Sequence, residues 1–178
     1  MKKIFKYIFA GMAAMSVVAC SEDALETSPS SSVSGNELLG TATNALVSLN
    51  GVYRAMYTAG VSNSSNTHQC FGITAYNLVA DVMGEDCIMN GQGSGWFWYD
   101  CVYNVKSRYT STGWRSYDMW NGYYTWISNV NYILAEEETM SGSETEKNYV
   151  LGQAYAVRAY SYFMLAQMFS RTYKGHES

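Results

Sequence analysis

The sequence has little of several features that mark common functional classes. It holds a single proline, no Cys-x-x-Cys pair, and no cluster of basic residues beyond its first six positions. Scarce proline combined with long periodic stretches favours helices over a turn-rich β-sandwich. A nucleic-acid interface needs a basic patch and a zinc site usually needs paired cysteines, so neither is expected. Residues 91–95 read GQGSG without a following Gly-Lys-Ser/Thr, which argues against a phosphate-binding loop.

The sequence does contain apolar and aromatic residues in amounts typical of a folded domain. Of its 178 residues, 48% are hydrophobic and 15% aromatic, which excludes disorder for most of the length and suits one domain. Apolar residues recur every three or four positions in four stretches, the period of a helix face. These predicted helices run from about Asn36 to Tyr57, Gln69 to Met83, Tyr117 to Glu137 and Ser143 to Phe169.

The spacing also predicts which side of each helix is buried. The first face is Leu38, Ala42, Ala45, Leu49, Val52 and Met56, and the second is Phe71, Ala75, Leu78 and Val82. The third is Trp120, Tyr123, Ile127, Val130 and Leu134, and the fourth is Leu151, Tyr155, Ala159, Tyr162, Leu165 and Phe169. N-terminal capping boxes are predicted at Ser34 with Glu37 and at Ser143 with Glu146.

The four helical patterns predict an all-α fold built from helical hairpins. A short link joins the third and fourth helices, so the two are expected to lie antiparallel. Residues 84–113 lack a helical period and form a long aromatic loop insertion. The simplest architecture is therefore an array of tetratricopeptide-like hairpins that carries this insertion.

The N-terminus has the layout of a secretory signal with a lipoprotein cleavage site. Lysines within the first six residues precede the apolar run Tyr7 to Val18, which is too short to span a membrane. The run ends in Val-Val-Ala-Cys, which resembles a bacterial lipobox and makes Cys20 the predicted lipidation site. Residues 1–19 are then a signal peptide, residues 20–35 a flexible serine-rich tether, and the acyl chains a membrane anchor. The alternative is an ordinary signal peptide with a chance cysteine.

Internal segments carry the most specific signal in the chain. They read NALVSLNGVYRAMY at 44–57, ADVMGED at 80–86, WNGYYTWISNVNYIL at 120–134 and GQAYAVRAYSYFMLAQMF at 152–169. Together with Cys20, these segments resemble the N-terminal part of SusD/RagB-family outer-membrane lipoproteins. Members of this family are longer, so the resemblance implies that residues 36–178 are the N-terminal part of a truncated SusD-like helical domain.

The resemblance also implies a function. Members of the family are surface-exposed, lipid-anchored proteins of the outer membrane that bind glycans or other nutrients and cover a TonB-dependent transporter barrel. A non-enzymatic nutrient-binding lipoprotein is therefore expected, with a transporter partner, an oligosaccharide ligand, no nucleic acid and no cofactor. Two other classes stay open. One is a helical scaffold for protein assembly; the other is a lipid-anchored glycosidase that uses acids such as Glu85, Asp86, Asp100 or Asp118.

The aromatic insertion and its end supply the candidates for ligand contact. These are Trp96, Trp98, Tyr99, Asp100, Asn104 and Trp114. Aromatic faces stack on the C–H faces of sugar rings, while the aspartate and asparagine can bond hydroxyl groups. If the segment is extended, Trp96 and Trp98 point to the same side. The alternative is that the rings fill the core beneath a long loop.

One charge interrupts the apolar last helix. Arg158 needs a partner if it is covered, and Asp81 is the candidate for a structural ion pair, with Asp118 as a second choice. The alternative is an arginine whose stem packs while its guanidinium reaches water.

No metal site is expected from the cysteines and histidines. Cys70, Cys87 and Cys101 lack metal-binding spacing, and His68 and His176 are remote from each other. Outside the cytoplasm the three cysteines can form one disulfide, although buried thiols are the simpler interpretation.

Overall fold

The regular elements in the described part of the protein are helical. The computed structural model describes residues 38–60, 66–84, 87–102, 110–171 and 174–175. The longer helices are α3 (Ala42–Ala55), α4 (Ile73–Met83), α6 (Trp114–Ala135) and α7 (Glu144–Phe169). Between them lie a 3-10 turn, η2 (Thr67–Gln69), and a one-turn helix, α5 (Trp98–Cys101). The prediction of an all-α fold is confirmed for the described residues.

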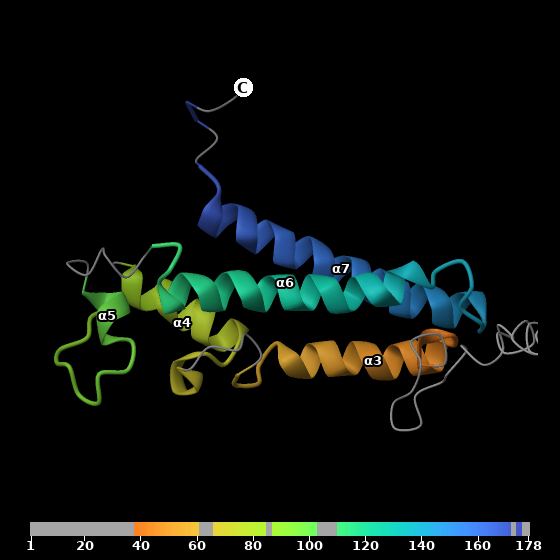
Figure 1. The fold of residues 1–178 in the computed structure, drawn as a ribbon, viewed down its shortest axis with the longest axis horizontal. Coiled ribbons are helices and arrows are strands. Elements are labelled where there is room, and N and C mark those ends of the chain that lie inside the picture. The colour runs from red at the N-terminus through yellow and green to blue at the C-terminus, as the bar shows by residue number, and fades with distance from the viewer. Residues whose placement is uncertain (1–37, 61–65, 85–86, 103–109, 172–173, 176–178) are drawn as a thin grey trace, which may run out of the picture. The chain divides into compact units, whose positions relative to one another are not determined.

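The helices α6 and α7 form an antiparallel hairpin joined by residues 136–143 (Figure 1). The helix α3 packs against both members of this hairpin. This arrangement agrees with the short connection between the third and fourth predicted helices. A tetratricopeptide-like character of the hairpin stays a prediction.

The helices α3 and α4 follow each other along α6 instead of forming a second hairpin (Figure 1). At one end, the N–H of Ala42 donates to the carbonyl of Ser141 at 2.8 Å, and the N–H of Ser141 donates to the carbonyl of Gly40 at 2.9 Å. These bonds place the start of α3 beside the connection between α6 and α7. At the other end, the Tyr76 hydroxyl on α4 donates to the carbonyl of Asp118 at 3.0 Å. Thus α4 lies along the first half of α6, and α3 along the second.

A left-handed glycine sets the junction between α3 and α4. Gly72 has φ +70°, and a Cβ placed on it would lie 2.0 Å from the carbonyl oxygen of Met56. The N–H of Ile73 donates to that same carbonyl at 2.8 Å. The predicted start of this helix at Gln69 is therefore wrong, because the chain needs a residue without a side chain at position 72.

The first helix also begins later than its period predicts. Thr41 has extended backbone angles, and its hydroxyl accepts a hydrogen bond from an N–H in the first turn of α3. The predicted capping box of Ser34 and Glu37 lies outside the described residues. Within the predicted face only Leu38 is misplaced: it is 43% exposed, and its neighbour Leu39 is buried in its place.

The remaining faces were predicted with mixed success. Leu78 on α4 and Trp120 on α6 are exposed, while the other members of their predicted faces are buried or half-buried. The largest error concerns α7, which buries Val150, Leu151, Ala154, Val157, Ser161 and Leu165. The predicted residues Tyr155, Ala159, Tyr162 and Phe169 are exposed instead. Because α7 is apolar around most of its circumference, more than one face satisfies the helical spacing.

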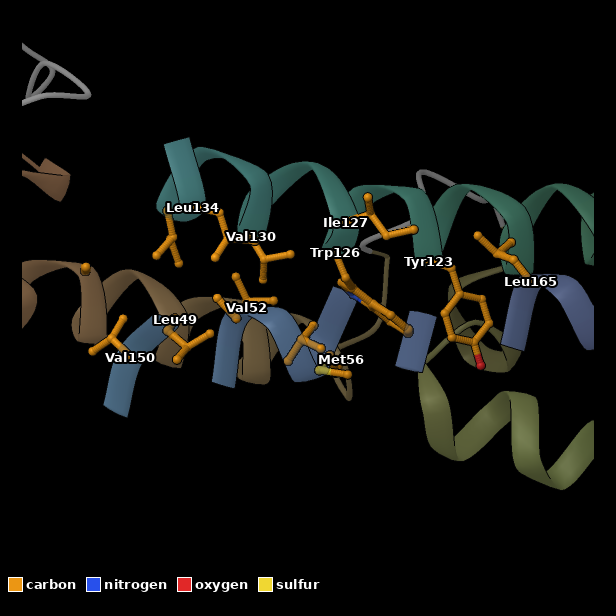
Figure 2. Close-up of a cluster of buried hydrophobic side chains, with 14 of the residues drawn as sticks. Leu49, Val52, Met56, Tyr123, Trp126, Ile127, Val130, Leu134, Val150 and Leu165 are labelled. Carbon is orange, nitrogen blue, oxygen red and sulfur yellow. The ribbon is translucent and has the colours of Figure 1, made fainter. Parts of the chain in front are cut away.

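The core lies where α3, α6 and α7 meet. Figure 2 shows Leu49 and Val52 of α3 facing Val130 and Trp126 of α6, with Val150 of α7 beside them. All five of these side chains are at most 4% exposed. Full burial of an aliphatic side chain contributes about 1.5–3 kcal/mol, so this contact supplies much of the stability that holds the helices together.

The capping box predicted at the start of α7 is present. The Ser143 hydroxyl accepts from the Glu146 N–H, and the Glu146 carboxylate accepts from both the N–H and the hydroxyl of Ser143. The bonds from the Ser143 side chain and backbone lower the pKa of Glu146. A carboxylate with a lowered pKa stabilises the folded state above its unfolded pKa, and this contribution is lost as the pH falls through the folded value.

Ser143→Ala is expected to lower the free energy of unfolding by about 1 kcal/mol at pH 7, because the first turn of α7 loses its cap. The difference from the wild type should narrow as the pH falls below the ordinary range for a glutamate and through the lowered pKa of Glu146, below which the carboxylate is protonated in both proteins. Urea denaturation at several pH values measures both effects. Ser128→Ala, an exposed serine in the middle of α6, is the control and should lose no stability. Equal stability of Ser143→Ala and the wild type at pH 7 would contradict the assignment.

Candidate functional site

Arg115, at the start of α6, is buried and binds groups from three segments. Its Nε and Nη2 donate to the two carboxylate oxygens of Asp100 on α5 at 3.2 and 2.9 Å. Its Nη1 donates to the backbone carbonyl of Gln69 in η2 at 2.7 Å and lies 3.8 Å from the Asp118 carboxylate on α6. The side chains of Arg115 and Asp100 are both 4% exposed. Because removing one partner would leave a buried charge uncompensated, these groups are stable only together.

Two aromatic rings enclose the same guanidinium. The Arg115 Cζ lies 4.3 Å from the centre of the Trp114 ring and 5.2 Å from that of Phe97. A cation over a ring face is attracted by its quadrupole, and more strongly where water is excluded. The guanidinium is thus held in place by hydrogen bonds along its edge and by rings over its faces.

Phe97 changes the direction of the aromatic segment. Its φ of 57° is left-handed, which is uncommon for a bulky residue. Its N–H donates to the side-chain Oε1 of Gln69 at 2.8 Å, and its buried ring meets Phe71 edge to face. These contacts offset the strain of the backbone. The segment is therefore not extended, so the condition under which Trp96 and Trp98 would point to the same side is not met.

An exposed pair of rings lies directly beside this buried layer. Trp96 is 50% exposed, and its ring centre lies 5.2 Å from that of His68 at an interplanar angle of 44°. The Nε2 of His68 lies 3.0 Å from the side-chain nitrogen of Gln69. We refer to these two rings as the His68–Trp96 pair.

The structure separates the residues that were predicted to contact a ligand. Trp96 and Tyr99 are exposed, Trp98 and Trp114 are half-buried, and Asn104 lies outside the described residues. Asp100 is 4% exposed and bound by Arg115, which gives it a structural role in place of the predicted contact with sugar hydroxyls.

Two of the four carboxylates considered for a glycosidase are buried in the same cluster. Asp100 and Asp118 are both buried beside Arg115, so they lack the access to substrate that a general acid and its partner need. Glu85 and Asp86 lie outside the described residues.

The structure gives Arg158 a different partner from the one predicted. Its Nη1 donates to the Asn131 side chain across the α6–α7 hairpin at 3.0 Å, and its Cζ lies 4.9 Å from the Tyr155 ring. Asp81 is exposed on α4, while Asp118 belongs to the buried cluster around the arginine of α6. Among the described residues, no ion pair joins Arg158 to either acid. The arrangement corresponds to the alternative, an arginine whose guanidinium lies at the surface.

Two tyrosines, Tyr76 and Tyr123, are titratable groups buried in the core. Burial raises the pKa of Tyr76, and the nearby Asp118 carboxylate raises it further; burial likewise raises the pKa of Tyr123. Both tyrosines therefore stay neutral at physiological pH. In the part of the chain that the structure describes, no group of three His, Cys, Asp or Glu side chains is placed to hold a metal ion. No disulfide joins the three cysteines of the same part.

Comparison with protein-family models gives a match over most of the chain. Residues 23–177 match a SusD-like family model that carries the description "Starch-binding associating with outer membrane". The chain belongs to the SusD-like family. Neither the curated proteins nor the solved structures contain a significant match to it. The resemblance seen in the sequence is confirmed, and the SusD-like chain is thereby a member of a family of starch-binding proteins associated with the outer membrane.

Sequence reasoning assigned no role to Arg115 or Gln69 of the SusD-like chain and considered His68 only as a metal ligand. One signal was available. Asp100 ends an aromatic run inside the insertion and Arg115 directly follows Trp114 at its end, so opposite charges lie next to aromatic residues at two points of this segment. Nothing in the sequence marks Gln69, because its role depends on the fold bringing η2 to Phe97.

A second aromatic surface of the SusD-like chain lies on α6 and α7. Trp120 contacts Tyr124 and Phe169, and Tyr124 contacts Tyr162, at ring-centre distances of 4.7, 5.1 and 6.4 Å. All four side chains are 38–48% exposed. The last two contacts have interplanar angles of 87° and 89°, so the rings form ridges instead of one flat platform. We refer to these four residues as the α6–α7 aromatic face.

The ends of these helices also border an open groove. It has a volume of about 540 Å³ and lies between α4, the start of α6 and the end of α7. Its apolar lining includes Val79, Met83, Met119, Met168 and Phe169. Since Phe169 belongs to both features, the groove extends the apolar surface of the α6–α7 aromatic face. Among the described helices, none is both long and apolar enough to cross a membrane.

Proposed function

We propose that this SusD-like protein is a non-catalytic glycan-binding lipoprotein. In this proposal it captures starch-type oligosaccharides at the cell surface and passes them to a TonB-dependent transporter of the outer membrane. Membership of the SusD-like family supports the glycan ligand and the membrane location. The predicted lipobox at Cys20 supports attachment through acyl chains, with residues 20–35 as the tether.

The observation that carries glycan binding is the His68–Trp96 pair. Half of the Trp96 side chain is exposed, so its indole face can stack on the C–H face of a sugar ring. The imidazole beside it at 5.2 Å can donate to, or accept from, a hydroxyl on the same sugar. Tyr99, 40% exposed on α5, offers a further ring with a hydroxyl. A few polar groups around an aromatic contact are what an orientation-specific ligand site requires.

Trp96→Ala is expected to weaken the binding of maltoheptaose, a linear starch fragment, by about tenfold or more in Kd. The reason is the loss of the stacking face, and isothermal titration calorimetry measures the change. Trp120→Ala is a matched control, since it removes a tryptophan of similar exposure, 46%, from a different surface. It should leave the Kd unchanged. An unchanged Kd in Trp96→Ala, or no binding of maltoheptaose by the wild type, would contradict the proposal.

A helical scaffold for protein assembly is the second candidate, and the α6–α7 aromatic face favours it. Between Asn148 and Ser170 the sequence of α7 contains one charged residue, Arg158. Exposed aromatic rings with few charges nearby are typical of the centres of protein interfaces. The same two variants separate the candidates. If neither the wild type nor Trp96→Ala binds maltoheptaose while Trp120→Ala abolishes co-purification of a partner protein in mild detergent, the scaffold is favoured.

A further inference from the structure

The two rings of the His68–Trp96 pair come from segments far apart in the sequence. His68 lies in η2, and Trp96 precedes α5. The rings are in contact at the surface, where Trp96 is half exposed. A contact between exposed rings is too weak to hold two loops at a fixed spacing, so something beneath the rings must set that spacing.

One buried side chain bonds the neighbours of both rings. The Arg115 guanidinium has only hydrogen-bond donors. It donates to the backbone carbonyl of Gln69, the residue after His68, at 2.7 Å. It also donates two hydrogen bonds to the Asp100 carboxylate on α5 and lies over the Phe97 ring, the residue after Trp96. The same planar group therefore holds both segments at once.

Gln69 supplies a second link between the same segments. Its side-chain Oε1 accepts the N–H of Phe97 at 2.8 Å, and its backbone carbonyl accepts from Arg115. The left-handed backbone of Phe97 persists because these bonds and the burial of its ring hold it. That conformation sets the direction in which Trp96 leaves the turn.

We propose that Arg115 is the positioning residue of the His68–Trp96 pair, acting through Gln69 on one side and Asp100 on the other. Arg115 itself is buried and does not touch the ligand. It sets the separation and the angle of the two exposed rings, on which stacking and hydroxyl recognition of one sugar depend. This inference rests on the proposed glycan binding and deepens it.

Lysine cannot replace arginine in this role. Its ammonium group keeps the positive charge that compensates Asp100, but it is a point charge without the planar fork that reaches a carboxylate and a carbonyl together. Arg115→Lys therefore keeps the charge that compensates Asp100 but removes the hydrogen bonds that position the two segments. Arg158→Lys is the matched control, because Arg158 also bonds one side chain and lies against one ring, on a different surface.

The test combines circular dichroism, which reports whether the variant is folded, with a ¹⁹F NMR probe of the surroundings of Trp96. The protein is labelled with 5-fluorotryptophan, and the ¹⁹F signal of Trp96 is identified as the one missing from Trp96→Phe. In Arg115→Lys the Trp96 signal is expected to shift and broaden, while circular dichroism remains helical. Its Kd for maltoheptaose should rise by about tenfold, whereas Arg158→Lys should match the wild type in both measurements.

Each outcome decides the question. A folded Arg115→Lys protein with a wild-type Trp96 signal would overturn the inference, whatever its Kd. If the wild type does not bind maltoheptaose but the Trp96 signal responds to Arg115→Lys, the proposed function fails and the positioning role stands. Should Arg115→Lys fail to fold, Gln69→Met replaces it, since this change removes the side-chain contacts of Gln69 with the Phe97 N–H and with His68 Nε2 and keeps the backbone carbonyl that accepts from Arg115. An unaltered Trp96 signal in Gln69→Met would then count against the inference.

Discussion

Replacing Gly72 by alanine is expected to lower the free energy of unfolding by about 3 kcal/mol or more. Two effects add. The backbone at φ +70° is strained for any residue with a side chain, and the new Cβ would lie 2.0 Å from the carbonyl oxygen and 2.5 Å from the carbonyl carbon of Met56. Both are backbone atoms, so no side-chain rotation relieves the clash. Urea denaturation followed by circular dichroism measures the loss.

Gly152→Ala is the matched control for this substitution. Gly152 lies in the middle of α7, and a Cβ placed on it would meet nothing within 4 Å. Alanine has the higher helix propensity, so this variant should gain about 0.5–1 kcal/mol. The two glycine substitutions are thus expected to have opposite signs. A wild-type denaturation midpoint for Gly72→Ala would contradict the geometry of the α3–α4 junction.

Arg115→Met is expected to destabilise the protein by about 3–5 kcal/mol, because it leaves two buried carboxylates without their cation. Asp100 and Asp118 are 4% and 1% exposed, so water cannot take the place of the guanidinium. The loss should appear at pH 7 as a lower urea midpoint and a lower Tm, because the guanidinium also bonds the backbone carbonyl of Gln69 and links two segments to α6.

Arg158→Met serves as the control for the loss of an arginine. Its hydrogen bond to Asn131 is exposed, and exposed polar contacts of this kind are worth about 0–1 kcal/mol. Thermal and urea denaturation of both variants at pH 7 make the comparison. Equal losses in Arg115→Met and Arg158→Met would refute the assignment of Arg115 as a buried ion-pair partner.

Features of the fold that depend only on residues close together in the sequence could be predicted from it. The start of α7 was placed correctly because its capping box involves residues only three apart, Ser143 and Glu146. The start of α4 was not, because the conformation of Gly72 is set by its contact with Met56, the residue that follows α3. The buried face of α7 was predicted wrongly for a third reason. Its spacing fits several faces equally well, and the choice is made by the packing of α3 and α6.

Some residues of the candidate site could likewise be predicted from the sequence, whereas the roles of others depend on the fold. The aromatic run at 96–99 is visible in the sequence, and two of its residues, Trp96 and Tyr99, are exposed. The role of Asp100 was not visible, since it depends on a guanidinium that the fold brings to it from α6. His68 reaches Trp96 only because Gln69 is bonded to Phe97 and to that same guanidinium. Pairings of this kind lie beyond any periodic or local signal.

The backbone bonds that tie Ser141 to Gly40 and Ala42 have a mechanical consequence. They join the first turn of α3 to the connection between α6 and α7 by 2.8 and 2.9 Å hydrogen bonds. A pull applied to the chain before Gly40 therefore reaches two elements together and is shared between α3 and the hairpin. In the proposed N-terminal attachment to a membrane, a load on the bound glycan would therefore meet this bridge before it could unwind α3.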